Sequence, residues 1–343
     1  MAAITRARLG PAVATAIILS GCGGGDGGSA VNDDGTTTIT MSFTNNANTA
    51  PLVLGMQKGI FRKHGIDLKQ MPPSNAAGSS LVPLLLNGQV QASVTDVTAV
   101  PAAVSKNIGV HVIASVAADY ESPDSSIFAT MVRADSDIRS FKDLEGRTVG
   151  VNSLTGFWAL EVKEAVTKAG GDPAKVQMLA VDLPNQVATL QQGRVDAVST
   201  LQPFVAQLQQ AGYRSLGDPA AIALGPHSVG STIMAAKSFT AENPDTMRTF
   251  LRAWEEAVVY ANAHPDEVRV VIEQSTRTSA DVVRKLPLPW YVSGVSRSSV
   301  EKFMDLMVRY GDLDASLPID QVVWSEAAEA DLSTPPPGIS LAS

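Results

Sequence analysis

The sequence has one cysteine and four histidines, and these shortages exclude several classes of protein. A single cysteine among 343 residues can form neither a disulfide framework nor a cysteine-type zinc site. The histidines, His64, His111, His227 and His264, have no H-x-x-x-H or comparable metal-ligand spacing. The sequence also lacks a G-x-S-x-G nucleophile elbow and a G-x-x-x-x-G-K-[ST] phosphate loop. We therefore expect no metal, no cofactor and no catalysis.

Runs of basic residues are also missing. The 26 Lys and Arg residues are outnumbered by 34 Asp and Glu, so the formal charge is −8. The charge becomes −10 once a leader that contains Arg6 and Arg8 is removed. An acidic surface without a Lys/Arg run argues against nucleic acid as a partner. With 45% hydrophobic residues, the chain is long enough for two globular domains.

A mostly apolar run occupies Leu9–Leu19 and is too short to span a bilayer. It follows Arg6 and Arg8 and ends in small residues. A basic start, a short apolar middle and small residues before a cleavage point are typical of a secretory signal peptide. We expect this signal peptide to occupy residues 1–21.

The end of that leader carries the only cysteine. The tetrad Leu19-Ser20-Gly21-Cys22 resembles the bacterial lipobox, which implies cleavage before Cys22 and lipidation of that residue. A plain signal peptide with an incidental cysteine is the alternative. Residues 22–37 are rich in glycine and would form a flexible tether, with the folded part on the outer face of the cell membrane.

One stretch of the sequence occurs twice. Leu190–Val198, LQQGRVDAV, matches Leu85–Ser93, LLNGQVQAS, at a spacing of 105 residues. Gly65 and Gly170, each at the end of a helix-like segment, have the same spacing. Each copy predicts the alternation of helices and short apolar strands that is typical of a helix-covered parallel sheet. The repeat therefore predicts two similar α/β lobes.

We expect the chain to cross twice between these lobes, which would create a hinge. The strand predicted at Phe128–Val132 leaves the first lobe, and the strand at Ser231–Ala236 returns to it. A long amphipathic helix is predicted at Pro244–Asn262, and we interpret its apolar stripe as core. The expected division is lobe one (38–131 and 232–330), lobe two (132–231) and a frayed tail (331–343).

Candidate binding residues lie in the loops that follow the predicted strands, because ligands of doubly wound sheets bind beyond the carboxyl ends of strands. Helix N-termini that begin there could hold an anionic group. The candidates are Asn45, Asn46, Asn48, Ser74, Asn75, Ser79, Thr95 and Asp96 in lobe one, and Ser153, Thr155, Gly156, Phe157, Trp158, Gln202 and His227 in lobe two. Ser, Thr and Asn are also ordinary helix caps, which is the alternative for these loops.

Four of these candidates have specific alternatives. Asp96 would repel an anion and attract an amine or a donor heterocycle, or it caps a helix that begins at Val97. Either Phe157 or Trp158 would stack on a flat ligand, or both belong to the core. His227 would donate a hydrogen bond to a ligand or lie in a surface loop. The lobe-one loops have no Lys or Arg close to a strand end, so neutral donors would recognise most of an anion.

Several segments resemble the nitrate/sulfonate/taurine-type solute-binding proteins of ABC importers. They are, in order, Ala50–Leu52, Gln57–Leu68, Gly88–Ala92, Ser140–Gly150, Gly193–Ala197 and Phe250–Pro265. The resemblance implies an α/β, two-lobed periplasmic-binding-protein fold (type II-like), each lobe with a mainly parallel sheet and flanking helices. It also implies delivery of a solute to an ABC permease and its ATPase. Many relatives have an acidic residue where this chain has Gln202, so the resemblance does not give the ligand.

We therefore expect a monomeric extracytoplasmic lipoprotein that captures a small organic anion by hinge closure. The anion would be a sulfonate or an aromatic or aliphatic carboxylate. A stacked ring would favour an aromatic acid, an aromatic sulfonate or a pyrimidine over nitrate. The alternatives are a binding protein or synthase-like relative for a thiamine-pyrimidine precursor, and a sensory ligand-binding domain.

Overall fold

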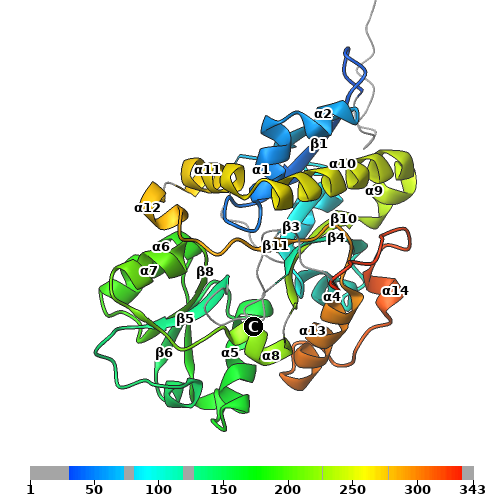
Figure 1. Ribbon diagram of the computed structural model, residues 1–343. Helices are drawn as coiled ribbons and strands as arrows, with labels where there is room; N and C mark the ends of the chain where they lie inside the picture. Colours follow the sequence, from blue (N-terminus) through cyan, green and yellow to red (C-terminus); the bar gives the residue numbers. More distant parts are fainter. Residues whose placement is uncertain (1–30, 73–80, 119–126, 226, 277, 334–343) are drawn as a thin grey trace, which may run out of the picture.

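Two β-sheets with helices around each organise the chain (Figure 1). The computed structural model describes residues 31–72, 81–118, 127–225, 227–276 and 278–333. Three candidate site residues, Ser74, Asn75 and Ser79, lie outside the described residues, as do Cys22 and the predicted signal peptide. Among the described residues, no helix has the length and apolar character needed to cross a membrane.

The first sheet has six strands in the order β11-β4-β10-β3-β1-β2. They are β1 (Thr37–Ser42), β2 (Ile66–Gln70), β3 (Ala92–Asp96), β4 (Val110–Ala118), β10 (Val229–Ala236) and β11 (Trp290–Tyr291). β1 pairs in parallel with β2 and β3. β10 runs antiparallel to both β3 and β4, and β11 runs antiparallel to β4 at the edge.

The second sheet has five strands in the order β7-β6-β8-β5-β9. They are β5 (Phe128–Val132), β6 (Thr148–Val151), β7 (Gln177–Ala180), β8 (Ala197–Leu201) and β9 (Arg214–Ser215). β6 pairs in parallel with β7 and β8, and β5 runs antiparallel to β8. The arrangement β2-β1-β3 of the first sheet therefore recurs as β7-β6-β8, as the repeat predicts.

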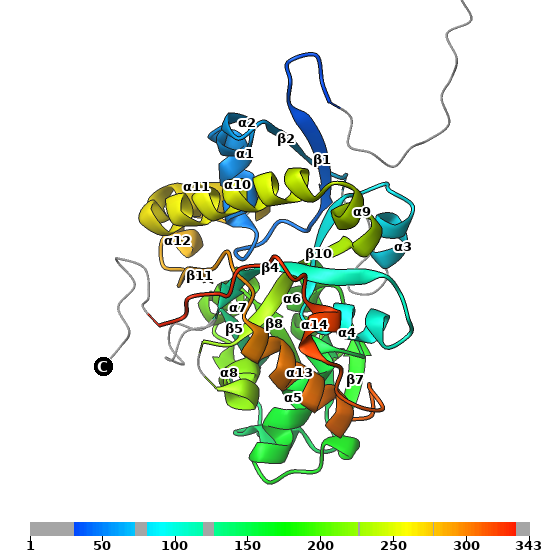
Figure 2. The same cartoon turned by 90° about the vertical axis from the view of Figure 1, so that its right-hand side faces the viewer.

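Helices cover the sheets because each has an apolar face that needs burial. Those around the first sheet are α1 (Ala50–Gln57), α2 (Ile60–Lys63), α3 (Val82–Leu86), α4 (Ala99–Val104), α9 (Lys237–Glu242), α10 (Pro244–Ala263), α11 (Pro265–Thr276), α12 (Ala280–Val283) and α14 (Ile319–Val322). Those around the second are α5 (Phe157–Lys168), α6 (Leu183–Gln191), α7 (Phe204–Gln210) and α8 (Pro219–Leu224). Figure 2 shows α10 and α11 beside α1 and α2, far from α5.

The stripe predicted on the long helix is part of the core. Met247, Phe250, Trp254 and Val258 of α10 are all buried. The helical stretch that follows β1 is divided into α1 and α2. Gly59 interrupts it with a φ of 68°, a left-handed conformation that glycine adopts without steric penalty.

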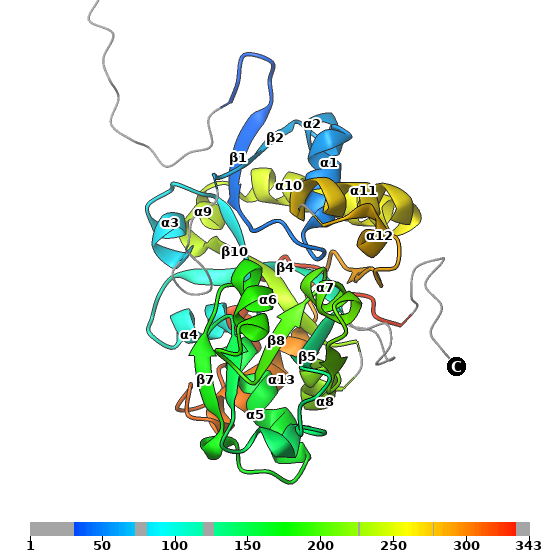
Figure 3. The same ribbon diagram turned by 90° about the vertical axis from the view of Figure 1, so that its left-hand side faces the viewer.

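Two connections join the sheets, one between β4 and β5 and one between β9 and β10. β5 pairs with β8 and β9, so Phe128–Val132 belongs to the second sheet. A further helix, α13 (Arg297–Arg309), contacts α5 and α8 as well as β10. This helix therefore touches both lobes. Figure 3 shows α6 and α7 beside β8, with α12 above α7.

Candidate functional site

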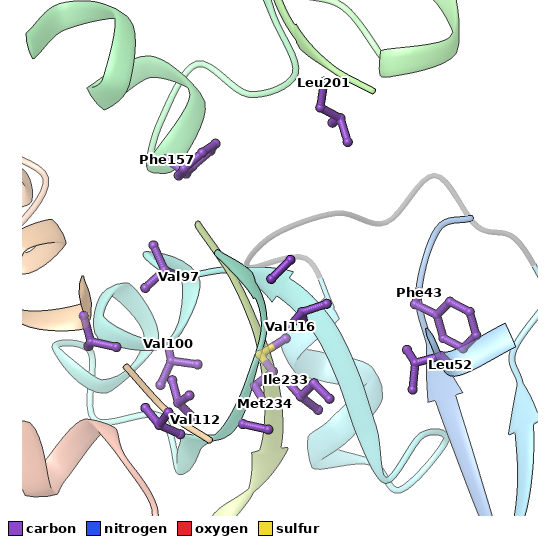
Figure 4. Packing of buried hydrophobic residues seen from close by; sticks show 14 of the residues in the cluster. Phe43, Leu52, Val97, Val100, Val112, Val116, Phe157, Leu201, Ile233 and Met234 are labelled. Carbon is purple, nitrogen blue, oxygen red and sulfur yellow. The ribbon is translucent and has the colours of Figure 1, made fainter. Parts of the chain in front are cut away.

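A cavity of about 120 Å³ lies between the two sheets. Its polar lining residues are Ser42, Thr44, Asn46, Asn48, Thr49, Thr95, Asp96, Asn152 and Ser231. Its other lining residues are Phe43, Leu81, Val94, Phe128, Phe157, Trp158, Leu183, Leu201 and Gly230. Figure 4 shows Phe157 and Leu201 from the second lobe opposite Phe43 and Val97 from the first. Ligand sites commonly have roughly 300–1,000 Å³, so this arrangement of the lobes fits only a small solute or part of a larger one.

The first lobe supplies hydrogen-bonding groups from the loop after β1 and the end of β3. Asn46 Oδ1 accepts a hydrogen bond from the Asn48 amide at 2.9 Å, which holds the loop in a turn. The Asn48 side chain then donates to Ser231 Oγ at 3.4 Å. Asn48 Oδ1 and Thr95 Oγ1 are buried without a hydrogen-bond partner among the described residues. Because an unpaired buried polar atom is unfavourable, these two atoms are suited to pair with a solute.

Asp96 is the only charged side chain among the described residues that line the cavity. It is half-buried and accepts hydrogen bonds from the Thr98 amide, at 3.0 Å, and from the Thr98 hydroxyl. Burial raises the pKa of Asp96, although the hydrogen bonds from Thr98 oppose that shift. Asp96 therefore lines the cavity and fixes the turn before α4, but it does not cap that helix, whose N-cap is Thr98. That helix begins at Ala99 rather than at Val97.

The N-terminus of α5 meets the first lobe directly. The Phe157 amide donates to Thr98 Oγ1 at 3.1 Å, and the Gly156 amide donates to Asp312 Oδ2 at 3.2 Å. A Cβ atom at Gly156 would lie 2.3 Å from Thr98 Oγ1, so only glycine permits this approach. We name this contact of Gly156 and Phe157 with Thr98 the interlobe clasp.

The clasp changes the predicted role of the helix terminus. Two amides that were expected to face an anion are already bound by protein oxygen atoms. The next two amides, of Trp158 and Ala159, have no partner among the described residues. Of these two residues only Trp158 lines the cavity, so an anion at this helix would have to bind at the Trp158 amide.

Phe157 and Trp158 are both buried, and both line the cavity. Their rings meet edge to face at a centroid distance of 5.2 Å, and Phe157 also packs on Phe128 and Phe303. Phe157 lies so close to Gly230 that a Cβ there would be 2.5 Å from the ring. Both residues therefore belong to the core and also line the cavity, and stacking of either ring on a flat ligand stays a prediction.

Other candidates lie away from this cavity. Asn45 accepts a hydrogen bond from the Gln70 side chain at 3.0 Å, and Ser153 accepts one from the Thr155 amide at 3.4 Å. Gln202 accepts one from the Ala206 amide at 3.2 Å and lines a second cavity. The ring of His227 packs against Trp290 at 5.2 Å between centroids. The polar cavity thus brings together Asn46, Asn48, Thr95, Asp96, Phe157 and Trp158 from the predicted set.

The sequence analysis omitted several lining residues, including Asn152 and Ser231. Asn152 directly follows β6, so the strand-end rule could have selected it. Ser231 lies in β10, which runs antiparallel between two parallel strands and presents its first residues at the cavity. A rule based on parallel strands does not select such a position. Among the described residues, no group of three or more His, Cys, Asp or Glu side chains could hold a metal.

Comparison with protein families gives a match over most of the chain. The family described as NMT1/THI5 like matches residues 46–268. A candidate binding protein of Brucella abortus (strain 2308) is 22% identical over 226 residues, which is 64% of this chain. The chain spans 65% of the length of that curated relative.

Solved structures share the architecture. The periplasmic aliphatic sulphonate-binding protein SsuA of Escherichia coli has a TM-score of 0.66 and 18% identity, covering 85% of this chain and 93% of its own. The periplasmic nitrate-binding protein NrtA of Synechocystis PCC 6803 has a TM-score of 0.69 and 14% identity, covering 84% and 86%. The desulfurization enzyme DSZB has a TM-score of 0.56 and 16% identity, covering 84% and 96%.

These structures confirm the predicted fold class, the two-lobed α/β fold of periplasmic binding proteins. The predicted resemblance to the nitrate- and sulfonate-binding type is confirmed at the same level. Since an enzyme has the same architecture, the fold does not distinguish a binding protein from an enzyme. The argument for one or the other function must therefore come from the residues that line the cavity.

Proposed function

The chain belongs to the NMT1/THI5-like family, and from that premise we propose that it is an extracytoplasmic solute-binding protein of an ABC importer rather than an enzyme. The observation that carries the proposal is the interlobe cavity with two unpaired, buried polar atoms, the amide oxygen Asn48 Oδ1 and the hydroxyl Thr95 Oγ1. Such atoms suit reversible capture of a polar solute, because the solute restores hydrogen bonds that the protein leaves unmade.

The proposed solute is a small organic anion, either a sulfonate or a carboxylate. For the polar groups of such a solute, neutral donors are available from the side chains of Asn48, Asn152 and Ser231 and from the amide of Trp158. A few hydrogen bonds and one packed ring can supply roughly −8 kcal/mol, which corresponds to a micromolar dissociation constant. Phe157 and Trp158 favour solutes with an apolar or flat part over nitrate.

One observation favours a second candidate ligand, a donor heterocycle such as a thiamine-pyrimidine precursor. Asp96 is the only charge at the described cavity wall, and a carboxylate attracts amino groups and repels anions. A ring with an exocyclic amine could bind Asp96 while packing against Trp158. The two candidate ligands differ in the group that Asp96 would face, which is an acid group in one case and an amino group in the other.

Thermal unfolding of the mature protein with single solutes tests both candidates. Sulfonates, benzoate and phthalate-like acids, nitrate and aminopyrimidines form the panel. A solute present at 100 times its dissociation constant stabilises the folded state by about 2.7 kcal/mol. A hit should lose its effect in a Thr95→Val variant, whereas the same substitution at exposed Thr155 should not matter. The absence of stabilisation by every solute would contradict the proposed binding function.

We propose that the two sheets with their helices close on the solute about the two connecting segments. The expected lobe boundaries, 38–131 with 232–330 and 132–231, remain part of this proposal, with all of β5 (Phe128–Val132) now counted in the second lobe and all of β10 (Val229–Ala236) in the first. Opening the lobes would break the interlobe clasp, so the clasp favours the closed arrangement. The closed shape would then be the form that a permease and its ATPase recognise.

We also propose that the chain is a monomer held on the outer face of the cell membrane by lipid on Cys22. Each methylene buried in the bilayer contributes about 0.8 kcal/mol, and stable anchoring takes more than one acyl chain. Globomycin, which inhibits lipoprotein signal peptidase, should cause the precursor to accumulate in expressing cells. A Cys22→Ser variant should be insensitive to it. Unchanged processing of the wild-type chain would refute the lipid anchor and leave the binding proposal intact.

A further inference from the structure

A second cavity of about 250 Å³ lies beside the first along the interlobe gap. Its wall combines β5 and α7 of the second lobe with α12, which follows α11 in the chain. Figure 1 shows α12 directly above α7. We name the 120 Å³ cavity the inner cavity and the 250 Å³ cavity the outer cavity.

The two cavities adjoin each other at Phe128. Phe128 lines both of them. Its partner in the sheet, Leu201, lines the inner cavity, and the next residue, Gln202, lines the outer one. The ends of β5 and β8 therefore contribute to both cavities, with Phe128 common to the two walls.

The two cavities differ in charge. The described wall of the inner cavity contains one charged group, the carboxylate of Asp96. The outer cavity has Asp281 and Lys285, but Asp281 is already paired with Arg284. Lys285 is exposed and forms no ion pair with any described residue. An available positive charge therefore faces the outer cavity, while a negative one faces the inner cavity.

We propose that the outer cavity is a second compartment of the solute site, and that the solute is an extended zwitterion with its amine at Asp96 and its acid group at Lys285. This inference rests on the solute-binding function proposed above. In this orientation the negatively charged acid group of the solute lies next to the ammonium group of Lys285. An acid group in the inner cavity would instead face Asp96 without a compensating charge, which is unfavourable in a partly desolvated site.

The arrangement also explains the size of the inner cavity. At about 120 Å³ it holds only one end of a solute, and the outer cavity provides the additional space. The apolar middle of the solute would lie against Phe128, between the two polar ends. Affinity should therefore depend on the distance between the two charged groups.

Three probes of one length separate the contributions of the two ends. They are 6-aminohexanoate, which has both charges, hexanoate, which has only the acid, and hexylamine, which has only the amine. Isothermal titration calorimetry would measure their binding to the mature wild-type protein and to the Asp96→Asn and Lys285→Gln variants. Lys106→Gln is the matched control, because Lys106 is an exposed lysine that lines neither cavity.

The expected pattern is selective. Asp96→Asn should weaken 6-aminohexanoate and hexylamine about tenfold and leave hexanoate unweakened, since an unpaired charge is lost from a partly buried site. Lys285→Gln should weaken 6-aminohexanoate and hexanoate about threefold and leave hexylamine unchanged, since an exposed pair contributes less. Only the Lys285-dependent part should fall with added salt, because exposed charges are screened. Lys106→Gln should match the wild type for all three probes.

A series of ω-amino acids from three to eight carbons tests the required length, and its affinity should peak at one member. If hexanoate or shorter acids bind with no effect of Lys285→Gln, the two-compartment inference is wrong and the proposed function stands. If affinity does not depend on chain length, the inference is also wrong. If a solute stabilises the protein in the thermal unfolding experiment but no ω-amino acid binds, the zwitterion inference is wrong and the proposed function stands. If no solute binds in either experiment, both the inference and the proposed function are wrong.

Discussion

Substitution of Gly156 by alanine is the sharpest test of the interlobe clasp. Gly156 has a φ of 70° and a ψ of −151°, a region that is nearly restricted to glycine, so any other residue there costs roughly 1–3 kcal/mol. The new Cβ would also lie 2.3 Å from Thr98 Oγ1. The two groups must separate, which breaks the 3.1 Å hydrogen bond from the Phe157 amide. Leaving that buried donor unpaired costs roughly another 1–3 kcal/mol.

A double-mutant cycle separates these two contributions. Thr98→Ala removes the clashing oxygen, and the atoms then nearest to the new Cβ are Thr98 Cβ at 3.5 Å and Asp96 Oδ1 at 3.6 Å, which are ordinary contacts. Gly156→Ala should therefore cost only the backbone term in the Thr98→Ala background, and the pair should couple by roughly 1–3 kcal/mol. Urea unfolding of the ligand-free protein measures each change.

Two controls define the outcome. Thr98→Ser keeps the hydroxyl and should behave like the wild type. Gly65→Ala lies at a φ of 78° with no atom within 4 Å of the new Cβ, so it should show a backbone penalty and no coupling to Thr98. Additive effects of Gly156→Ala and Thr98→Ala would mean that the clasp does not form in solution.

Three further predictions concern the core and the cavity. Burial lowers the pKa of His111 to about 4, so between pH 6.5 and about 4 the unfolded chain binds a proton on His111 that the folded chain does not. The free energy of unfolding should therefore fall by about 3 kcal/mol as the pH decreases through this range. Urea unfolding of a His111→Gln variant should lack this contribution to the pH dependence. Thr95→Val removes an unpaired buried hydroxyl, so the thermal midpoint of the free protein should remain the same or rise while solute affinity falls at least tenfold; a lower midpoint without loss of affinity would contradict this. Trp158→Leu should weaken ring-containing solutes more than aliphatic ones in calorimetry, and equal losses would exclude stacking.

The repeated stretch was sufficient to predict the central part of each sheet. A spacing of 105 residues separates Ala92, the first residue of β3, from Ala197, the first residue of β8. Both strands pair in parallel with the first strand of their repeat. Because the carboxyl ends of adjacent parallel strands meet, the strand-end rule selected Asn46 and Thr95, and both line the inner cavity. Local periodicity and strand direction are enough for predictions of this kind.

Contacts between distant segments could not be predicted in this way. The capping of α5 by Thr98 and Asp312 joins residues that are 59 and 156 positions away from their partners in the sequence. Neither residue differs from an ordinary loop residue by type or spacing. Gln202 satisfied the strand-end rule, but it follows β8 on the side of the outer cavity. The strand-end rule predicts at which edge of the sheet a residue lies, but it does not predict which of the two cavities at that edge the residue lines.

The clasp also limits where an anion can bind while the two lobes are in contact at Thr98. A helix N-terminus attracts anions through its free amides and its dipole, and α5 has two of its leading amides bound by Thr98 and Asp312. The Asp312 carboxylate already places a negative charge at this dipole, and Asp96 lies beside Thr98. A second anion at the same place would meet two carboxylates and no described cation in the cavity wall. The charges around the two cavities therefore favour an amine near α5 and an acid group of the solute near Lys285.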